Sequence, residues 1–121
     1  PWGNLGMTIC YDLRFPFLYK KLARQGAHFF SIPAAFTYTT GISHWESLLR
    51  ARAIENGCYV FAPAQCGYHD NGRRTFGNSM IIDPWGTILK RAKHSTGLIS
   101  CNIDLEKVNF YRKRIPAMTE Y

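Results

Sequence analysis

Residues 5–16 read LGMTICYDLRFP, an apolar run that meets a cysteine, a charged turn and a proline. The alternation of large and small residues over 5–9 predicts a buried strand, and Pro16 followed by apolar residues at helical spacing predicts a helix. Cys10 is therefore expected at a strand-to-helix elbow, where backbone N–H groups can stabilise negative charge on a substrate oxygen. The competing interpretation is that Cys10 is a small buried hydrophobic residue.

Strand and helix patterns alternate along the rest of the chain, which predicts a layered α/β fold. Strands are expected at 27–32, 58–63, 79–82, 87–89 and 98–103, and helices at 16–25, 43–56 and 105–111. The spacing of Ser43 and Glu46 is typical of a capping box at a helix start, and Asp104 is expected to cap the last helix. The glycine-rich, charged residues 65–77 predict a loop at the rim of the fold.

The composition is that of a packed globular protein, because 46% of the 121 residues are hydrophobic. No apolar run approaches the roughly 20 residues that span a bilayer, so no membrane association is expected. The net charge of +7 comes from basic residues scattered over several segments, which argues against a nucleic-acid partner. The four cysteines form no C-x-x-C pair, which argues against zinc and disulfides and favours a reducing compartment, the cytoplasm.

Four blocks follow one another in a distinctive order: residues 6–16 (GMTICYDLRFP), 33–36 (PAAF), 44–46 (HWE) running into 50–56 (RARAIEN), and 83–86 (DPWG). Together they resemble the nitrilase, or carbon-nitrogen hydrolase, superfamily. Residues 64–67 (AQCG), the arginine-rich segment after them and residues 114–116 (RIP) are most similar to Nit1-type amidases, a branch linked to deaminated glutathione. Phe17 and Asn78 depart from the pattern, since many relatives carry glutamate and histidine there.

The resemblance implies the C-terminal portion of an α-β-β-α four-layer sandwich, with dimers formed through the helices. Residues 1–103 would belong to the carbon-nitrogen hydrolase domain, and residues 104–121 would be a C-terminal extension. In the family a glutamate base and an oxyanion-binding lysine lie upstream of the nucleophilic cysteine, and here only nine residues precede Cys10. We therefore expect both to lie outside this chain, which would be inactive alone, and expect neither Lys20 nor Glu46 to replace them.

Several side chains are candidates for the site. The resemblance assigns Cys10 as nucleophile and the backbone N–H of Tyr11 as an oxyanion donor. The PAAF run would end the strand beside the elbow and line the pocket with Ala34, Ala35 and Phe36, or it would simply turn a strand. Candidate contacts to substrate or to the catalytic groups are Arg14, His44 and Glu46. Their structural alternatives are support of the elbow, a first-turn hydrogen bond and a helix cap, respectively.

A cysteine nucleophile of this kind predicts acyl transfer through a thioester. The resemblance implies hydrolysis of non-peptide carbon-nitrogen bonds in small linear amides, giving a carboxylate and ammonia without a metal or cofactor. A carbamoyl hydrolase or nitrilase of the same superfamily is an alternative. Another is a noncatalytic fragment or interaction half whose cysteine is structural.

Overall fold

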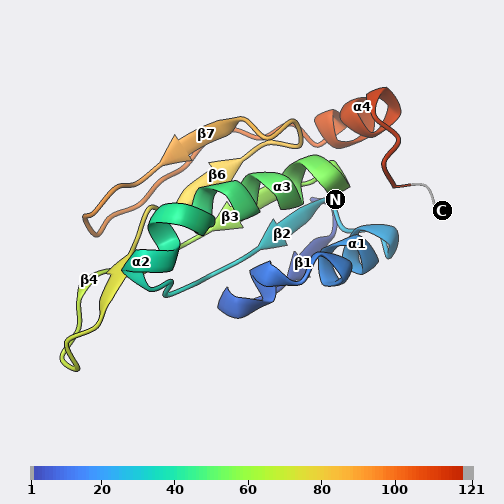
Figure 1. Cartoon of the computed structure of the whole chain (residues 1–121). Coiled ribbons are helices and arrows are strands. Elements are labelled where there is room, and N and C mark those ends of the chain that lie inside the picture. The colour runs from blue at the N-terminus through green and yellow to red at the C-terminus, as the bar shows by residue number, and fades with distance from the viewer. Residues whose placement is uncertain (1, 119–121) are drawn as a thin grey trace.

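A computed structural model describes residues 2–118, and a mixed β-sheet forms its centre (Figure 1). Within these residues the sheet has five strands in the order β1-β2-β3-β6-β7. The first three are parallel, and β6 and β7 continue the sheet as an antiparallel hairpin. The strands are β1 (Leu5–Met7), β2 (Phe29–Ser31), β3 (Tyr59–Ala62), β6 (Met80–Ile82) and β7 (Ile88–Arg91). Each overlaps a run predicted as a strand.

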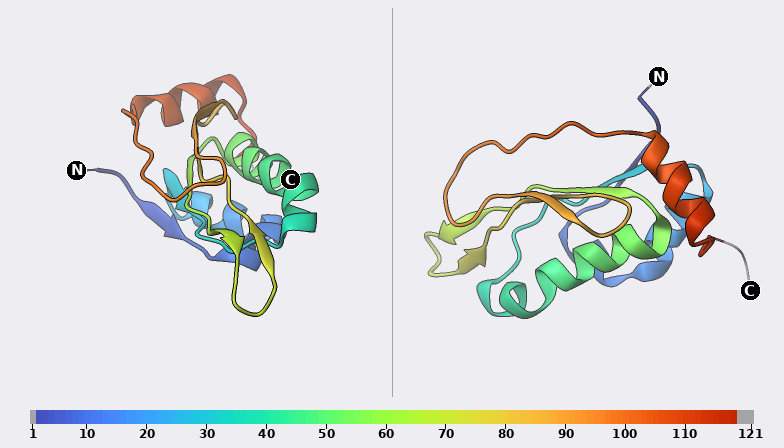
Figure 2. Two further views of the ribbon diagram at one scale, coloured as in Figure 1. Left: turned by 90° about the vertical axis from the view of Figure 1, so that its left-hand side faces the viewer. Right: turned by 90° about the horizontal axis from the view of Figure 1, so that it is seen from above.

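Two helices, α1 (Pro16–Arg24) and α3 (Glu46–Asn56), cover one face of the sheet, as the view from above shows (Figure 2). The predicted helix at 16–25 is confirmed, and Gly26 follows it with a φ of 105°, a conformation that suits glycine at a helix end. Helix α4 (Glu106–Arg114) lies at the end of the sheet where the parallel strands begin. Within residues 2–118, no helix is both long and apolar enough to cross a bilayer.

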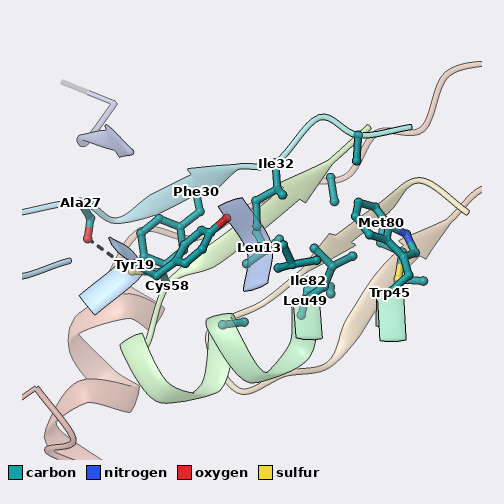
Figure 3. Close-up of a cluster of buried hydrophobic side chains, with 14 of the residues drawn as sticks. Leu13, Tyr19, Ala27, Phe30, Ile32, Trp45, Leu49, Cys58, Met80 and Ile82 are labelled. Atoms are coloured by element: carbon teal, nitrogen blue, oxygen red, sulfur yellow. Dashed lines mark hydrogen bonds between the residues drawn. The ribbon is translucent and has the colours of Figure 1, made fainter. Parts of the chain in front are cut away.

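The main hydrophobic core fills the space between the sheet and helices α1 and α3 (Figure 3). Side chains alternate between the two faces of a strand, so Phe30 and Val60 enter this core while their neighbours point away. Tyr19 of α1 meets Phe30 edge-on, with ring centroids 5.0 Å apart. Burial raises the pKa of Tyr19 to about 12, and its hydroxyl shares a 2.7 Å hydrogen bond with Thr8. Helix α1 is thereby joined to the strand that leads to Cys10.

The opposite face of the sheet is only partly covered. Phe29 and Tyr59 pack there against Val108 of α4, and the Tyr59 hydroxyl donates to the Asp104 carbonyl at 2.9 Å. The strand predicted at 98–103 is wrong, because these residues run past the sheet without joining a ladder, and Leu98 is fully exposed. An apolar run becomes a strand only where a neighbour accepts its hydrogen bonds, and residues 2–118 provide none here. The proposed division after residue 103 remains a prediction.

The loop predicted at 65–77 is wrong, since it contains a hairpin of β4 (Cys66–Tyr68) and β5 (Arg74–Phe76). The hairpin projects from the sheet at the end opposite α4 (Figure 1). Asn71 and Gly72 lie at its turn, a dipeptide typical of hairpins, and Gly72 has a φ of 80°. The guanidinium carbon of Arg74, Cζ, lies 3.5 Å from the ring centroid of Tyr38 and 5.2 Å from that of Tyr68. This stacking holds the hairpin against the helical layer.

The helix predicted to start at Ser43 begins earlier. A short helix α2 (Tyr38–Thr40) and a π-helical segment η2 (Gly41–Trp45) run directly into α3. Ser43 therefore lies inside a continuous helical stretch and caps nothing, so the predicted capping box is wrong. The buried Trp45 indole donates to the Asn78 carbonyl at 2.9 Å. That bond joins η2 to the residues that lead into β6.

Gly41 is required by close packing against the β4–β5 hairpin. A Cβ at this position would lie 2.3 Å from Cβ of Phe76. We expect Gly41→Ala to lower the free energy of unfolding by about 2 kcal/mol, because the hairpin must shift to relieve the overlap. Urea denaturation measures the loss. Gly97→Ala is the matched control, since a Cβ there meets nothing within 4 Å, and equal stability losses in both variants would contradict the steric explanation.

Candidate active site

Cys10 lies at the elbow between β1 and the short helical segment η1 (Cys10–Arg14). Its φ of 46° is in the left-handed region, where a residue other than glycine is strained by about 1–3 kcal/mol. The surroundings hold it there: the Cys10 N–H donates to the Pro33 carbonyl at 2.8 Å, and Asp12 Oδ2 accepts from the Ile9 N–H at 2.9 Å. The strain is thus balanced by hydrogen bonds that fix the position of the thiol.

The backbone N–H of Tyr11 follows the thiol directly. Among residues 2–118, no carbonyl accepts a hydrogen bond from it, as is usual in the first turn of a helix. Unpaired N–H groups at a helix start favour negative charge placed beside them. The elbow therefore presents a thiol and an available N–H donor on adjacent residues.

A cavity of about 770 Å³ opens beside Cys10. It lies where the parallel strands β1, β2 and β3 end, the edge at which open α/β sheets generally bind ligands. Ala34 and Ala35 line it, and the Ala34 N–H donates to the Pro63 carbonyl at 3.0 Å. Small side chains at these positions leave the space in front of the thiol open.

The cavity has a second wall that the sequence interpretation did not include. It comes from the segment after β3, the start of the β4–β5 hairpin, Ser79 and the irregular segment after β7: Pro63, Ala64, Gln65, Cys66, His69, Ser79, Ala92, Ser95, Thr96 and Gly97. The signal was present in the AQCG block, which follows the third apolar run just as PAAF follows the second. Parallel strands end at one sheet edge, so both blocks belong to one site.

Two polar side chains of this wall are held in place. Ser79 Oγ accepts from the Ala64 N–H at 2.8 Å, and His69 Nε2 lies 2.7 Å from the hydroxyl of the buried Thr75. Their positions are therefore set by bonds to the surrounding fold before any ligand binds.

Phe36, Arg14 and His44 are predicted site residues that do not line the cavity. Phe36 is buried in the core against Trp45, with ring centroids 4.8 Å apart. The Arg14 guanidinium lies over the Phe36 ring at 5.2 Å and donates to His44 Nδ1 at 3.2 Å. These contacts join the elbow to η2, so the geometry favours the structural alternative for Arg14 and His44.

Glu46 also has a structural partner. Its carboxylate forms an ion pair with Arg91 of β7, and Glu46 is not among the residues that line the cavity. The ladder of the β6–β7 hairpin brings Arg91 beside α3, which residue spacing alone does not show. Lys20 donates to the carbonyls of Glu55 and Ala117, and burial lowers its pKa. Neither residue lines the cavity beside Cys10.

Asn78, one of the two departures from the family pattern, is buried, has a φ of 62° and does not line the cavity. Its side-chain amide donates to the Phe76 carbonyl at 2.8 Å, and its Oδ1 accepts from Arg91 at 3.2 Å. The Asn78 side chain therefore joins β5 to β7.

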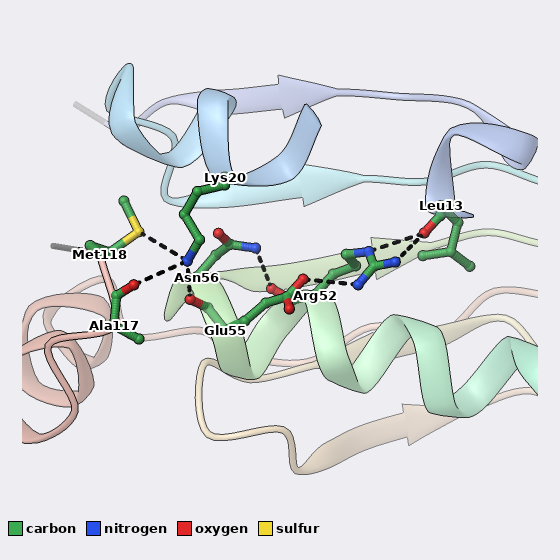
Figure 4. A network of polar contacts seen from close by, with 7 residues as sticks. All are labelled: Leu13, Lys20, Arg52, Glu55, Asn56, Ala117 and Met118. Carbon is green, nitrogen blue, oxygen red and sulfur yellow. Dashed lines mark hydrogen bonds and ion pairs between the residues drawn. The ribbon is translucent and has the colours of Figure 1, made fainter. Parts of the chain in front are cut away.

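A buried arginine supports the elbow from the helical side (Figure 4). Arg52 of α3 donates to the Leu13 carbonyl through Nε at 3.0 Å and Nη2 at 2.8 Å. Its Nη1 forms a 2.9 Å ion pair with Glu55. Arg50, on the same helix, donates to the Gly86 carbonyl. Within residues 2–118, no cluster of three His, Cys, Asp or Glu side chains could hold a metal ion.

Comparison with known proteins agrees with this geometry. Among curated proteins, the chain is 53% identical over 117 residues to the deaminated glutathione amidase of Synechocystis sp., covering 97% of this chain and 43% of that relative. The crystal structure of the C. elegans NitFhit protein matches with a TM-score of 0.91 and 47% identity, covering 93% of this chain and 27% of that one. The chain thus spans less than half the length of either relative.

A further solved relative has a covalently modified active-site cysteine. It is a variant of an amidase from Nesterenkonia sp., with the acetamide moiety of fluoroacetamide added covalently at its active-site cysteine. Its TM-score is 0.68 at 31% identity, covering 77% of this chain and 35% of that one. The carbon-nitrogen hydrolase family profile matches residues 1–113. The chain belongs to the carbon-nitrogen hydrolase family and has a nitrilase-like α/β fold.

Proposed function

We propose that this chain supplies the nucleophile of an amidase that converts small linear amides into a carboxylate and ammonia. The observation that carries the proposal is the strained Cys10 elbow, which opens into a cavity at the ends of three parallel strands. The cysteine-bound acetamide group in the Nesterenkonia amidase supports the same role for Cys10.

The proposed reaction uses two groups of this chain. The Cys10 thiolate adds to the amide carbonyl, and the Tyr11 N–H donates to the oxyanion that forms. The tetrahedral intermediate expels the amine, which takes a proton and leaves as ammonia, and a thioester remains on Cys10. Water then adds to the thioester, the carboxylate leaves, and the thiol is restored.

The remaining catalytic groups are proposed to lie outside this chain. The family resemblance assigns a glutamate that takes the thiol proton and a lysine that shares the oxyanion, both upstream of the cysteine. We therefore propose that the chain is inactive alone and that activity requires the protein encoded by the full reading frame.

Deaminated glutathione, or an amide of similar chemistry, is the proposed substrate, because the curated relative from Synechocystis sp. bears that name and shares 53% identity. The dimer and the cytoplasmic location remain predictions from the sequence.

Thiol labelling tests the proposed nucleophile. In the full-length protein at pH 8, iodoacetamide is expected to modify Cys10 first, because a catalytic base makes its thiolate available. Cys66 lines the same cavity and is the matched control for access. Cys58 should stay unlabelled, because burial raises its pKa to about 11, which leaves only ~0.1% as thiolate at that pH.

Peptide mass spectrometry at successive times measures the labelling rates of Cys10, Cys66 and Cys58. Equal slow labelling of Cys10 and Cys66 would contradict an activated nucleophile. Labelling of Cys58 should rise only as the pH approaches 11 or as the protein unfolds.

A further inference from the structure

A smaller cavity of about 140 Å³ lies at the β4–β5 hairpin. It shares the lining residues Ala35, Gln65 and His69 with the cavity beside Cys10, so the two cavities adjoin, and together they are called the cleft. Its far end is lined by polar and cationic side chains, Asn71, Arg73 and Thr75. A ligand whose reacting group lies at Cys10 could therefore extend beneath the hairpin turn.

Arg73 is the cationic residue of that far end. Its backbone is fixed at the turn, since its carbonyl accepts from the His69 N–H at 2.8 Å and its N–H donates to Asn71 Oδ1 at 3.0 Å. Among residues 2–118, no carboxylate pairs with its guanidinium. The adjacent Arg74, in contrast, is stacked between Tyr38 and Tyr68 and lines neither cavity.

We infer that Arg73 binds a carboxylate of the substrate at the end remote from the amide that Cys10 attacks. The inference rests on the proposed amidase function. It adds that the substrate carries a carboxylate at the end remote from its amide. A guanidinium can meet a carboxylate with two parallel hydrogen bonds, which gives both affinity and orientation. The neighbouring acid, Asp70, does not line the cleft and leaves this end cationic.

Steady-state kinetics of the full-length protein tests the subsite. The probes are monoamides of linear dicarboxylic acids of increasing length, each paired with an analogue whose carboxylate is replaced by a hydroxymethyl group. At the length that spans the cleft, Arg73→Ala should raise KM for the acid about tenfold. KM for the neutral analogue and kcat for both should stay unchanged, because the contact is equally strong in ground and transition states.

Two further variants distinguish a specific contact between Arg73 and the carboxylate from a general effect of positive charge. Arg73→Lys keeps the charge without the fork and should restore part of the affinity for the acid. Lys90→Ala removes one positive charge from an exposed residue that lines neither cavity, and it should leave the preference for the acid intact. Equal effects of Arg73→Ala on acid and neutral probes at every length would overturn the inference, as would an equal loss of preference in Lys90→Ala.

A binding measurement distinguishes failure of the subsite from failure of the amidase proposal. Calorimetry on the full-length Cys10→Ser protein, with and without Arg73→Ala, compares the acid with its neutral analogue in the absence of turnover. Tighter binding of the acid that depends on Arg73 supports the subsite even if no amide is hydrolysed, in which case the amidase proposal alone fails. Binding that is independent of Arg73 overturns the subsite even if hydrolysis by Cys10 is established.

Discussion

Replacing Cys10 by serine in the full-length protein is expected to lower kcat/KM for amide hydrolysis by at least about 10⁴-fold. The serine hydroxyl has nearly the same size but is a far weaker nucleophile when only a carboxylate base is available. The elbow itself should survive, because the bonds that hold it use the Cys10 backbone N–H and the Asp12 carboxylate. Ammonia release measures the rate, and the unfolding curve verifies that the fold is intact.

Cys66→Ser provides the matched control, since it makes the same atomic change in the same cavity. It should leave the rate nearly unchanged. Mass spectrometry of the wild-type protein quenched during turnover should also find an acyl group on the peptide that contains Cys10. If both serine variants lose activity to the same small extent, Cys10 is not the nucleophile.

Arg52→Ala is expected to lower the free energy of unfolding by about 3 kcal/mol. The guanidinium is buried, and its two bonds to the Leu13 carbonyl connect η1 to α3. Truncation leaves that carbonyl without its partner and opens a cavity between the helices. Because η1 begins at Cys10, we also expect kcat to fall under conditions in which the variant is still folded.

Urea denaturation and ammonia release measure the two effects of Arg52→Ala. Glu55→Gln is the control, because it removes the ion pair with Arg52 but keeps both bonds to Leu13. Glu55 is partly exposed, so its loss should cost no more than about 1 kcal/mol. A Glu55→Gln variant as unstable as Arg52→Ala would show that the ion pair, rather than the support of Leu13, provides the stability.

The regular elements of the sheet and of α1 could be predicted because their signals are local. A buried strand shows as an apolar run, as at 58–63, and helix α1 shows as Pro16 followed by periodic apolar residues and closed by Gly26. The position of Cys10 at the end of such a run could be predicted for the same reason. Local periodicity depends only on residues that are close in sequence, so it can be recognised without their tertiary contacts.

The failures share one cause, which is dependence on a distant partner. Residues 98–103 have the composition of a strand but no neighbour within residues 2–118 to pair with. Residues 66–76 look like a loop, yet the stack of Arg74 between Tyr38 and Tyr68 supports a hairpin. Glu46 has the spacing of a helix cap but pairs with Arg91, 45 positions away.

The sequence by itself determined the family, the α/β class and the nucleophile candidate at a strand end, because these depend on residue type and order. Only the tertiary structure decided which side chains surround that cysteine. It showed that the candidates Arg14, Phe36, His44 and Glu46 do not line the cavity, and it placed Gln65, His69 and Arg73 along the cleft. The reason is geometric, since strand register and helix packing decide which distant residues share a sheet edge.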